Sequence, residues 1–354
     1  MKKVGILTWH YGANYGAKAQ AYALQKTIQF LGFEAQIIDY RIKNYYLKNL
    51  KINLKLSSKI KKFKFTPVMD IQIVRKLNVL ERFNSKYNLT NRITRISEIN
   101  DLGLDSIVLG SDAIFNIYHP FFNEVYYGVG LKNSKLITYA PSCENLPPET
   151  NLGMRVKESL NSVHKISVRD VNTELLIENN VHKSPVITLD PTLLYEFSDI
   201  NAKIPEFGCK YILLYAFSDW AVYSEQIKEY AKQHSLKIIS LGYYYNWVDL
   251  NYVQCSFEEW VSAFRCAELV VTDSFHGTVF SIKNDKEFII IGRSDKNSKI
   301  TSLLNDCNIQ RSFYNGGEPI DEYLSRPIDY TRVKKKIEEK VIASIEYLKN
   351  ALLY

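Results

Sequence analysis

Apolar segments that fit buried strands alternate along the chain with segments of helical periodicity. Residues 3–9 (KVGILTW) fit a buried strand, and apolar residues then recur every three or four positions from Ala17 to Leu31, as on one face of a helix. A second apolar segment at 34–40 completes a βαβ unit, which requires a parallel sheet with a right-handed crossover. The chain therefore opens as a doubly wound α/β domain.

The same alternation continues in two separate series. The first adds strands where short apolar runs end in small or polar residues, at 106–112, 135–142, 165–170 and 185–190. The second predicts strands at 210–217, 237–243, 268–273 and 287–292, with helices at 221–235, at 257–268 and from 277. Loop-forming residues at 196–209 separate the two series and predict a linker.

We therefore predict two doubly wound, Rossmann-like α/β domains that face each other across a cleft. The N-terminal domain is expected over 1–195, and the C-terminal, donor-binding domain over 205–328. An amphipathic helix at 329–354 is expected to join the N-terminal domain. In doubly wound sheets, ligands bind at the carboxyl ends of the strands, so functional residues are sought there.

The distribution of charge excludes one class of function. The net charge is +7, but nine basic residues and no acidic ones lie in 41–69, which leaves about −2 for the rest of the chain. A general nucleic-acid binder would carry a wider basic surface, so no nucleic-acid partner is expected. The amino-terminal apolar run is too short for a signal peptide, and no window suits a transmembrane helix, so a cytoplasmic protein is expected.

The cysteines and histidines show no metal-ligand spacing. Five cysteines are scattered without a CxxC pair, and the six histidines are equally dispersed. We expect reduced thiols and no metal site.

Residues 270–282 (VVTDSFHGTVFSI) combine a strand, a polar turn and the start of a helix. Asp273, Ser274 and His276 occupy the turn, and the segment from Gly277 predicts the next helix. A helix amino terminus offers free N–H groups and a partial positive charge, which suit a phosphate or carboxylate. A histidine buried in the core and satisfied by a backbone carbonyl is the alternative for His276.

Residues 10–16 (HYGANYG) form a glycine-rich turn between the first strand and helix. Gly16, Asn14 and Lys18 are candidates to hold an anionic group, although a tight turn alone also needs glycine. His10 follows the strand directly and is expected to line the cleft. Asp39 ends the second strand, but without a GxGxxG fingerprint nicotinamide binding is not expected.

Two further strand ends carry polar candidates. Ser111 and Asp112 close an apolar strand and are expected either to accept sugar hydroxyls or to cap a helix. Arg169 ends another strand and has the geometry to clamp phosphate or carboxylate; a salt bridge to Asp170 or a helix cap is the alternative.

Six segments, in order, together resemble the polysaccharide pyruvyl transferase family: 5–25, 108–116, 137–142, 166–170, 189–194 and 272–282. The resemblance spans about 3–310 and implies a two-domain GT-B-type protein. It implies transfer of the enolpyruvyl carbon of phosphoenolpyruvate to two hydroxyls of a sugar, giving a cyclic ketal, with phosphoenolpyruvate as co-substrate and no cofactor. Some characterised members carry arginine where this chain has Ser274, and glutamine-valine-tryptophan where it has Ala113, Ile114 and Phe115.

With this resemblance, the candidates fall into three roles. His276, Arg169 and Asp112 are the predicted catalytic residues, with His276 as acid or base. The predicted donor-binding residues are Asn14, Gly16, Lys18, Ser274, Gly277, Lys299 and Ser302. The predicted acceptor-binding residues are His10, Ser111 and Asp273.

Three questions stay open from the sequence. The first is the acceptor, which is expected to be a sugar or a lipid-linked oligosaccharide. The second is the basic segment 41–69, which fits either peripheral contact with an anionic membrane or a helical hairpin that covers the domain. The third is the function itself, for which there are two rivals. A nucleotide-sugar glycosyltransferase of GT-B architecture is the nearest rival function. A non-catalytic sugar-binding protein is the rival from a different class.

Overall fold

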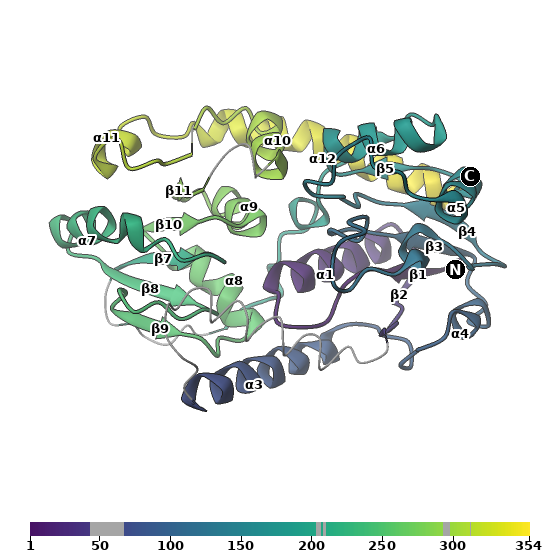
Figure 1. Cartoon of the computed structure of the whole chain (residues 1–354), viewed down its shortest axis with the longest axis horizontal. Helices are drawn as coiled ribbons and strands as arrows, with labels where there is room; N and C mark the ends of the chain where they lie inside the picture. Colours follow the sequence, from purple (N-terminus) through teal and green to yellow (C-terminus); the bar gives the residue numbers. More distant parts are fainter. Residues whose placement is uncertain (43–66, 203–206, 208–209, 293–297, 312) are drawn as a thin grey trace. The chain divides into compact units, whose positions relative to one another are not determined.

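The computed structural model describes residues 1–42, 67–202, 207, 210–292, 298–311 and 313–354. The chain divides into two compact units. Unit 1 comprises Met1–Tyr45, Asn84–Glu196 and Lys335–Tyr354, and unit 2 comprises Tyr46–Phe83 and Phe197–Lys334. Each unit is built on its own parallel sheet, and the elements of both are labelled in Figure 1.

Unit 1 is a parallel α/β unit. Its four-stranded sheet has the order β2-β1-β3-β4, with β1 at Lys3–Leu7, β2 at Glu34–Ile37, β3 at Ser106–Leu109 and β4 at Lys135–Thr138. A separate pair of short parallel strands follows, β5 at Ser167–Val168 and β6 at Val186–Ile187. The helices are α1 (Tyr15–Phe30), α4 (Ile96–Asn100), α5 (Met154–Ser162) and α6 (Val171–Val181), with short 3-10 turns at Phe83–Lys86, Glu124–Tyr127 and Pro191–Leu193.

The last helix, α12 (Tyr330–Leu353), attaches to unit 1 through its carboxyl-terminal half. The backbone N–H of Leu189 donates to Ser344 Oγ at 3.0 Å, and the hydroxyl of Tyr347 donates to the carbonyl of Thr138 at 3.1 Å. These bonds fix one face of α12 beside the carboxyl ends of β4 and β6.

Unit 2 contains a five-stranded parallel sheet of order β11-β10-β7-β8-β9. The strands are β7 (Tyr211–Tyr215), β8 (Lys237–Leu241), β9 (Leu250–Tyr252), β10 (Leu269–Thr272) and β11 (Glu287–Ile290). The helices are α3 (Pro67–Arg82), α7 (Ser224–Gln233), α8 (Phe257–Cys266), α9 (Phe275–Lys283), α10 (Ser298–Asp306) and α11 (Ile320–Leu324), with a 3-10 turn at Ala221–Tyr223. β7 and β10 are buried along their whole length, as expected for strands covered on both faces.

Two features differ from the sequence-based expectation. Helix α3 lies within the range expected for the N-terminal domain, yet it belongs to unit 2, because its Lys76 donates to the carbonyl of Gly242 at 2.9 Å and its Leu77 and Leu80 are buried. Strand β9 was not expected, because it has only three residues, none of them fully buried, at the edge of the sheet. Most of the basic segment 41–69 lies outside the described residues.

Several strands end earlier than their apolar runs suggest. β3 stops at Leu109 because Gly110 has a φ of +129° and Asp112 a φ of +74°, neither of which continues an extended strand. None of the helices in the described ranges is long and apolar enough to cross a membrane.

Candidate functional site

Polar side chains of unit 1 gather at the carboxyl ends of its strands and form a buried network. Arg169, directly after β5, donates from Nη1 to Asp190 Oδ2 at 2.8 Å, and the two side chains are 3% and 0% exposed. Ser111, after β3, donates from Oγ to the carbonyl of Ala140 at 2.7 Å and lies 3.4 Å from Asp190 Oδ2. Strand ends that are separate in the sequence are therefore joined through Asp190.

Arg169 is surrounded by negative charge. Burial lowers the pKa of Arg169, but Asp190, Asp112 and Asp170 outweigh that effect and raise it. The neighbouring Asp170 instead caps α6, accepting from the N–H of Thr173 at 2.9 Å. Of the structural alternatives for Arg169, a salt bridge is therefore right, but its hydrogen-bonded partner is Asp190 rather than Asp170.

Asp112 combines an unusual backbone with an unused acceptor. Its φ of +74° lies in the left-handed region, which costs free energy for a residue with a Cβ, although aspartate tolerates this conformation better than most residues. Its Oδ1 accepts from the N–H of Ala113 at 2.8 Å, and no helix begins there. Its Oδ2 is buried and has no hydrogen-bond partner among the described residues. A hydroxyl group could supply the missing donor.

The glycine-rich turn of 10–16 is organised as a helix cap. Asn14 Oδ1 accepts from the N–H of Gly16 at 2.9 Å and from the N–H of Ala17 at 3.3 Å, which satisfies the first free amides of α1. The ammonium group of Lys18 is buried and donates to Asn84 Oδ1 at 3.0 Å. The cap accounts for Asn14 and Gly16 in this structure, and donor binding by these residues stays a prediction.

His10 is fully buried, with an acceptor beside each ring nitrogen. Nε2 lies 3.1 Å from Asp39 Oδ1 and Nδ1 lies 3.2 Å from the carbonyl of Thr8. Burial lowers the pKa of His10, although both partners act against it. Burial would also raise the pKa of Asp39, but hydrogen bonds from His10 and Arg41 lower it to about 2. A contact of His10 with an acceptor sugar would require it to give up one of these bonds.

In unit 2, Asp273 organises the loop that follows β7. Its carboxylate accepts from the N–H of Phe217 at 2.8 Å, from the N–H of Ser218 at 3.1 Å and from Trp220 Nε1 at 2.9 Å. Burial raises the pKa of Asp273 above its ordinary value, and these hydrogen bonds offset only part of that rise. This residue therefore shapes the carboxyl edge of the sheet, and its predicted contact with the acceptor stays a prediction.

The start of α9 has a capped and closely packed geometry. Ser274 is the N-cap and accepts from the N–H of Gly277 at 3.4 Å. A Cβ added at Gly277 would lie 2.1 Å from Thr272 Oγ1, so only glycine lets α9 approach β10 this closely. His276 lies in the first turn of α9, between Ser274 and Gly277 in the sequence, and is 7% exposed. Lys299 and Ser302 lie half-buried on α10.

Two residues of the unit 1 network were not among the predicted site residues. Asp190 lies within the 189–194 segment, whose Asp-Pro pair is a turn signal that carries no indication of a distant partner. Gln20 donates from Nε2 to Thr8 Oγ1 at 3.0 Å, and its Oε1 accepts from the N–H of Ser111 at 3.2 Å. The helical spacing of α1 places Gln20 near β1, but it does not show that the side chain is buried there.

The described residues contain no group of three or more histidine, cysteine, aspartate or glutamate side chains arranged to hold a metal ion. Within those same ranges, Cys143, Cys255, Cys266 and Cys307 are free thiols.

Solved structures with similar folds are distant in sequence. A UDP-GlcNAc 2-epimerase from Neisseria meningitidis bound to UDP-GlcNAc is 10% identical with a TM-score of 0.51, covering 99% of this chain and 97% of that chain. A TarM variant from S. aureus in complex with Fondaparinux, alpha-GlcNAc-glycerol and UDP is 10% identical with a TM-score of 0.53, covering 100% of both. These likenesses confirm the expected fold class, an α/β protein with two Rossmann-like domains of GT-B type.

Sequence comparison identifies the family. No curated protein matches the chain. A family model described as polysaccharide pyruvyl transferase matches residues 14–295. Because this match covers most of the chain, the protein belongs to the polysaccharide pyruvyl transferase family.

Proposed function

We propose that the protein transfers a pyruvyl group from phosphoenolpyruvate to two hydroxyls of one sugar residue, in a cell-surface polysaccharide or its lipid-linked precursor. The family match over 14–295 carries this proposal, and it includes the predicted site residues except His10, Lys299 and Ser302. Contact of the segment 41–69 with an anionic membrane surface, where a lipid-linked acceptor would lie, is part of the proposal.

The proposed reaction balances without a cofactor. A proton is added to the methylene carbon of phosphoenolpyruvate, and the first sugar hydroxyl attacks the resulting oxocarbenium-like carbon and loses its own proton. The bond from this carbon to the phosphate oxygen then breaks, the second hydroxyl attacks, and its proton leaves with inorganic phosphate. The product is a cyclic ketal that retains the carboxylate of pyruvate.

We assign the proton transfers to His276 and Asp112. An imidazole can donate or accept a proton, and His276 lies in the first turn of α9, where helix N–H groups favour an anion. The buried Oδ2 of Asp112 is an acceptor available for a hydroxyl proton. These two side chains supply the acid and the base that the scheme needs.

The sequence predicted that Arg169 clamps an anion, but this proposal gives it a different role. Its charge is already balanced by Asp190, Asp112 and Asp170, so an added phosphate would enter a negative environment. We propose that Arg169 is a positioning residue that holds this carboxylate cluster. The anionic donor is then assigned to the start of α9 and to Lys299.

A nucleotide-sugar glycosyltransferase is the second candidate. It is favoured by Ser274, which stands where some family members carry arginine, and by the presence of UDP in the TarM complex with its similar fold. A non-catalytic sugar-binding protein would bind an acceptor and turn over neither donor.

Phosphorus NMR of the protein with phosphoenolpyruvate and candidate polysaccharide fragments distinguishes these candidates. The proposal predicts acceptor-dependent release of inorganic phosphate, with the acceptor gaining the mass of one pyruvyl ketal. Release of a nucleoside diphosphate from a nucleotide sugar, with no use of phosphoenolpyruvate, would replace the proposal with the second candidate.

A further inference from the structure

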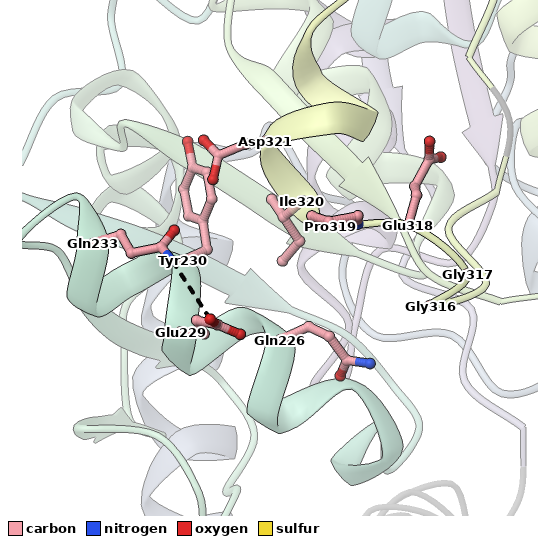
Figure 2. A pocket seen from close by; sticks show the side chains of 10 residues that line it. All are labelled: Gln226, Glu229, Tyr230, Gln233, Gly316, Gly317, Glu318, Pro319, Ile320 and Asp321. Atoms are coloured by element: carbon pink, nitrogen blue, oxygen red, sulfur yellow. Dashed lines mark hydrogen bonds between the residues drawn. The ribbon is translucent and has the colours of Figure 1, made fainter.

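Unit 2 contains a surface pocket that is lined by none of the residues to which a function has been assigned so far. It has a volume of about 440 Å³ and lies between α7, α11 and the loop that precedes α11. Figure 2 shows Gln226, Glu229 and Gln233 along α7 on one side, and on the other the loop from Gly316 to Pro319 with the start of α11 at Ile320 and Asp321. This volume falls in the range of small-molecule sites, about 300–1,000 Å³.

The loop that forms one wall is held firmly. The hydroxyl of Tyr314 donates to the carbonyl of Glu318 at 2.9 Å, and Asn315 Oδ1 accepts from the N–H of Gly317 at 2.9 Å. Gly316 has a φ of +77°, and a Cβ there would lie 3.1 Å from the ring of Tyr223. The glycine therefore lets the loop pack closely against Tyr223 and Gln226.

The chemistry of the lining excludes anions. Glu229, Glu318 and Asp321 contribute carboxylates, and no lysine or arginine is among the lining residues. Asp321 is paired with His234, whose Nε2 lies 2.8 Å from its Oδ1, so Glu229 and Glu318 are the carboxylates on which the exclusion of anions rests. The pKa of Tyr230 in the pocket wall is raised, mainly by burial and further by the negative charges of Asp321 and Glu287. A phosphate or a nucleotide would be repelled here.

The same lining suits hydroxyl groups. The side chains of Gln226, Gln233 and the carboxylates offer acceptors, and the two amides also donate. Gln226 Oε1 is buried with no hydrogen-bond partner among the described residues, so it can accept from a ligand hydroxyl. The ring of Tyr230 is stacked on the ring of His234 on one side, with centroids 4.1 Å apart, so its other face and its edge are the apolar surface against which a sugar ring can pack.

We propose that this pocket is an accessory binding site for uncharged sugar residues of the polysaccharide, one that disfavours residues already carrying the pyruvyl ketal. The second half of this inference rests on the proposed function, because the ketal is the reaction product and retains a carboxylate. Glu229 and Glu318 repel that charge, so unmodified segments of the polysaccharide are retained and modified ones are released.

Saturation-transfer NMR tests the proposal without any donor present. The probes are chitotriose, cellotriose, mannotriose and galactotriose, together with trigalacturonate as the anionic counterpart of the last. We expect at least one neutral trisaccharide to bind with a Kd on the order of 1 mM. We also expect binding to weaken at least about tenfold in Glu229→Lys, with trigalacturonate giving no signal.

Glu225→Lys is the matched control, because Glu225 lies on the same helix, is 85% exposed and does not line the pocket. This control should bind like the wild type, and both variants should keep the wild-type unfolding midpoint. The site is refuted if no neutral trisaccharide binds at ~10 mM, or if Glu229→Lys binds as the wild type does. Strong binding of trigalacturonate would refute the proposed discrimination against sugars that carry a carboxylate. If neutral sugars bind here while phosphoenolpyruvate binds nowhere, the proposed function fails and the sugar site stands.

Discussion

Arg169 and Asp190 form a buried ion pair across 21 residues of sequence, with 2.8 Å between Nη1 and Oδ2. In Asp190→Asn, the remaining amide oxygen can still accept from the N–H of Thr192, but the guanidinium loses its closest counter-ion. We expect the free energy of unfolding to fall by about 3 kcal/mol, as for other buried pairs from which one partner is removed.

Urea unfolding monitored by circular dichroism measures this change. Glu98→Gln is the control, because Glu98 pairs with Arg95 on the surface and its loss should leave the unfolding midpoint nearly unchanged. If Asp190→Asn unfolds like this control, the pair does not hold the network together.

Lys76 predicts a pH dependence of stability. Burial lowers its pKa from 10.5 to about 7. Between these two values the unfolded chain binds a proton that native Lys76 has released, so stability rises with pH by up to about 1.4 kcal/mol per unit. Below about pH 7 both states are protonated and this contribution levels off.

Lys76→Met should remove this slope, since methionine does not titrate. Unfolding of both proteins at a series of pH values from neutral to moderately alkaline gives the comparison. Parallel stability curves for the two proteins would show that Lys76 keeps its proton in the native state.

Gly277 is expected to be intolerant of even the smallest side chain. In Gly277→Ala the new Cβ would lie 2.1 Å from Thr272 Oγ1, so α9 would have to move away from β10 at a cost of about 1–3 kcal/mol. Gly317→Ala is a suitable control, because its Cβ would meet only the side chain of Asn315, at 3.1 Å. Equal thermal midpoints for the two variants would contradict this account of the contact.

His276→Gln tests whether His276 serves catalysis or the stability of the fold. If His276 transfers a proton, we expect kcat to fall about 10²- to 10⁴-fold while the unfolding midpoint stays near that of the wild type. His164→Gln serves as the control, because His164 is an exposed residue of unit 1 to which no role has been assigned. A large loss of stability together with activity would instead make His276 a core histidine.

Periodicity predicted the two parallel α/β sheets, because strand and helix repeats reflect burial that the sequence records directly, but it missed the edge strand β9. The roles of single polar residues were harder to predict. Asn14 and Ser274 cap helices, and Asp273 gathers a loop, since the side chains that suit a ligand also satisfy free backbone N–H groups.

Tertiary partners account for the other differences. Nothing near Arg169 in the sequence points to Asp190 as its partner, and the apolar spacing of α3 does not say which sheet the helix covers. Both depend on how distant segments pack. The positive φ of Asp112 is likewise invisible in the sequence, because aspartate adopts ordinary backbone conformations in most contexts.

Thermal stabilisation by phosphoenolpyruvate, set against UDP-sugars, tests the central claim most directly, because a ligand that binds only the folded state raises its midpoint. We predict that phosphoenolpyruvate raises the midpoint of the wild type and that Lys299→Ala weakens this effect, while UDP-sugars have none. Stabilisation by a UDP-sugar and not by phosphoenolpyruvate would contradict the proposed donor.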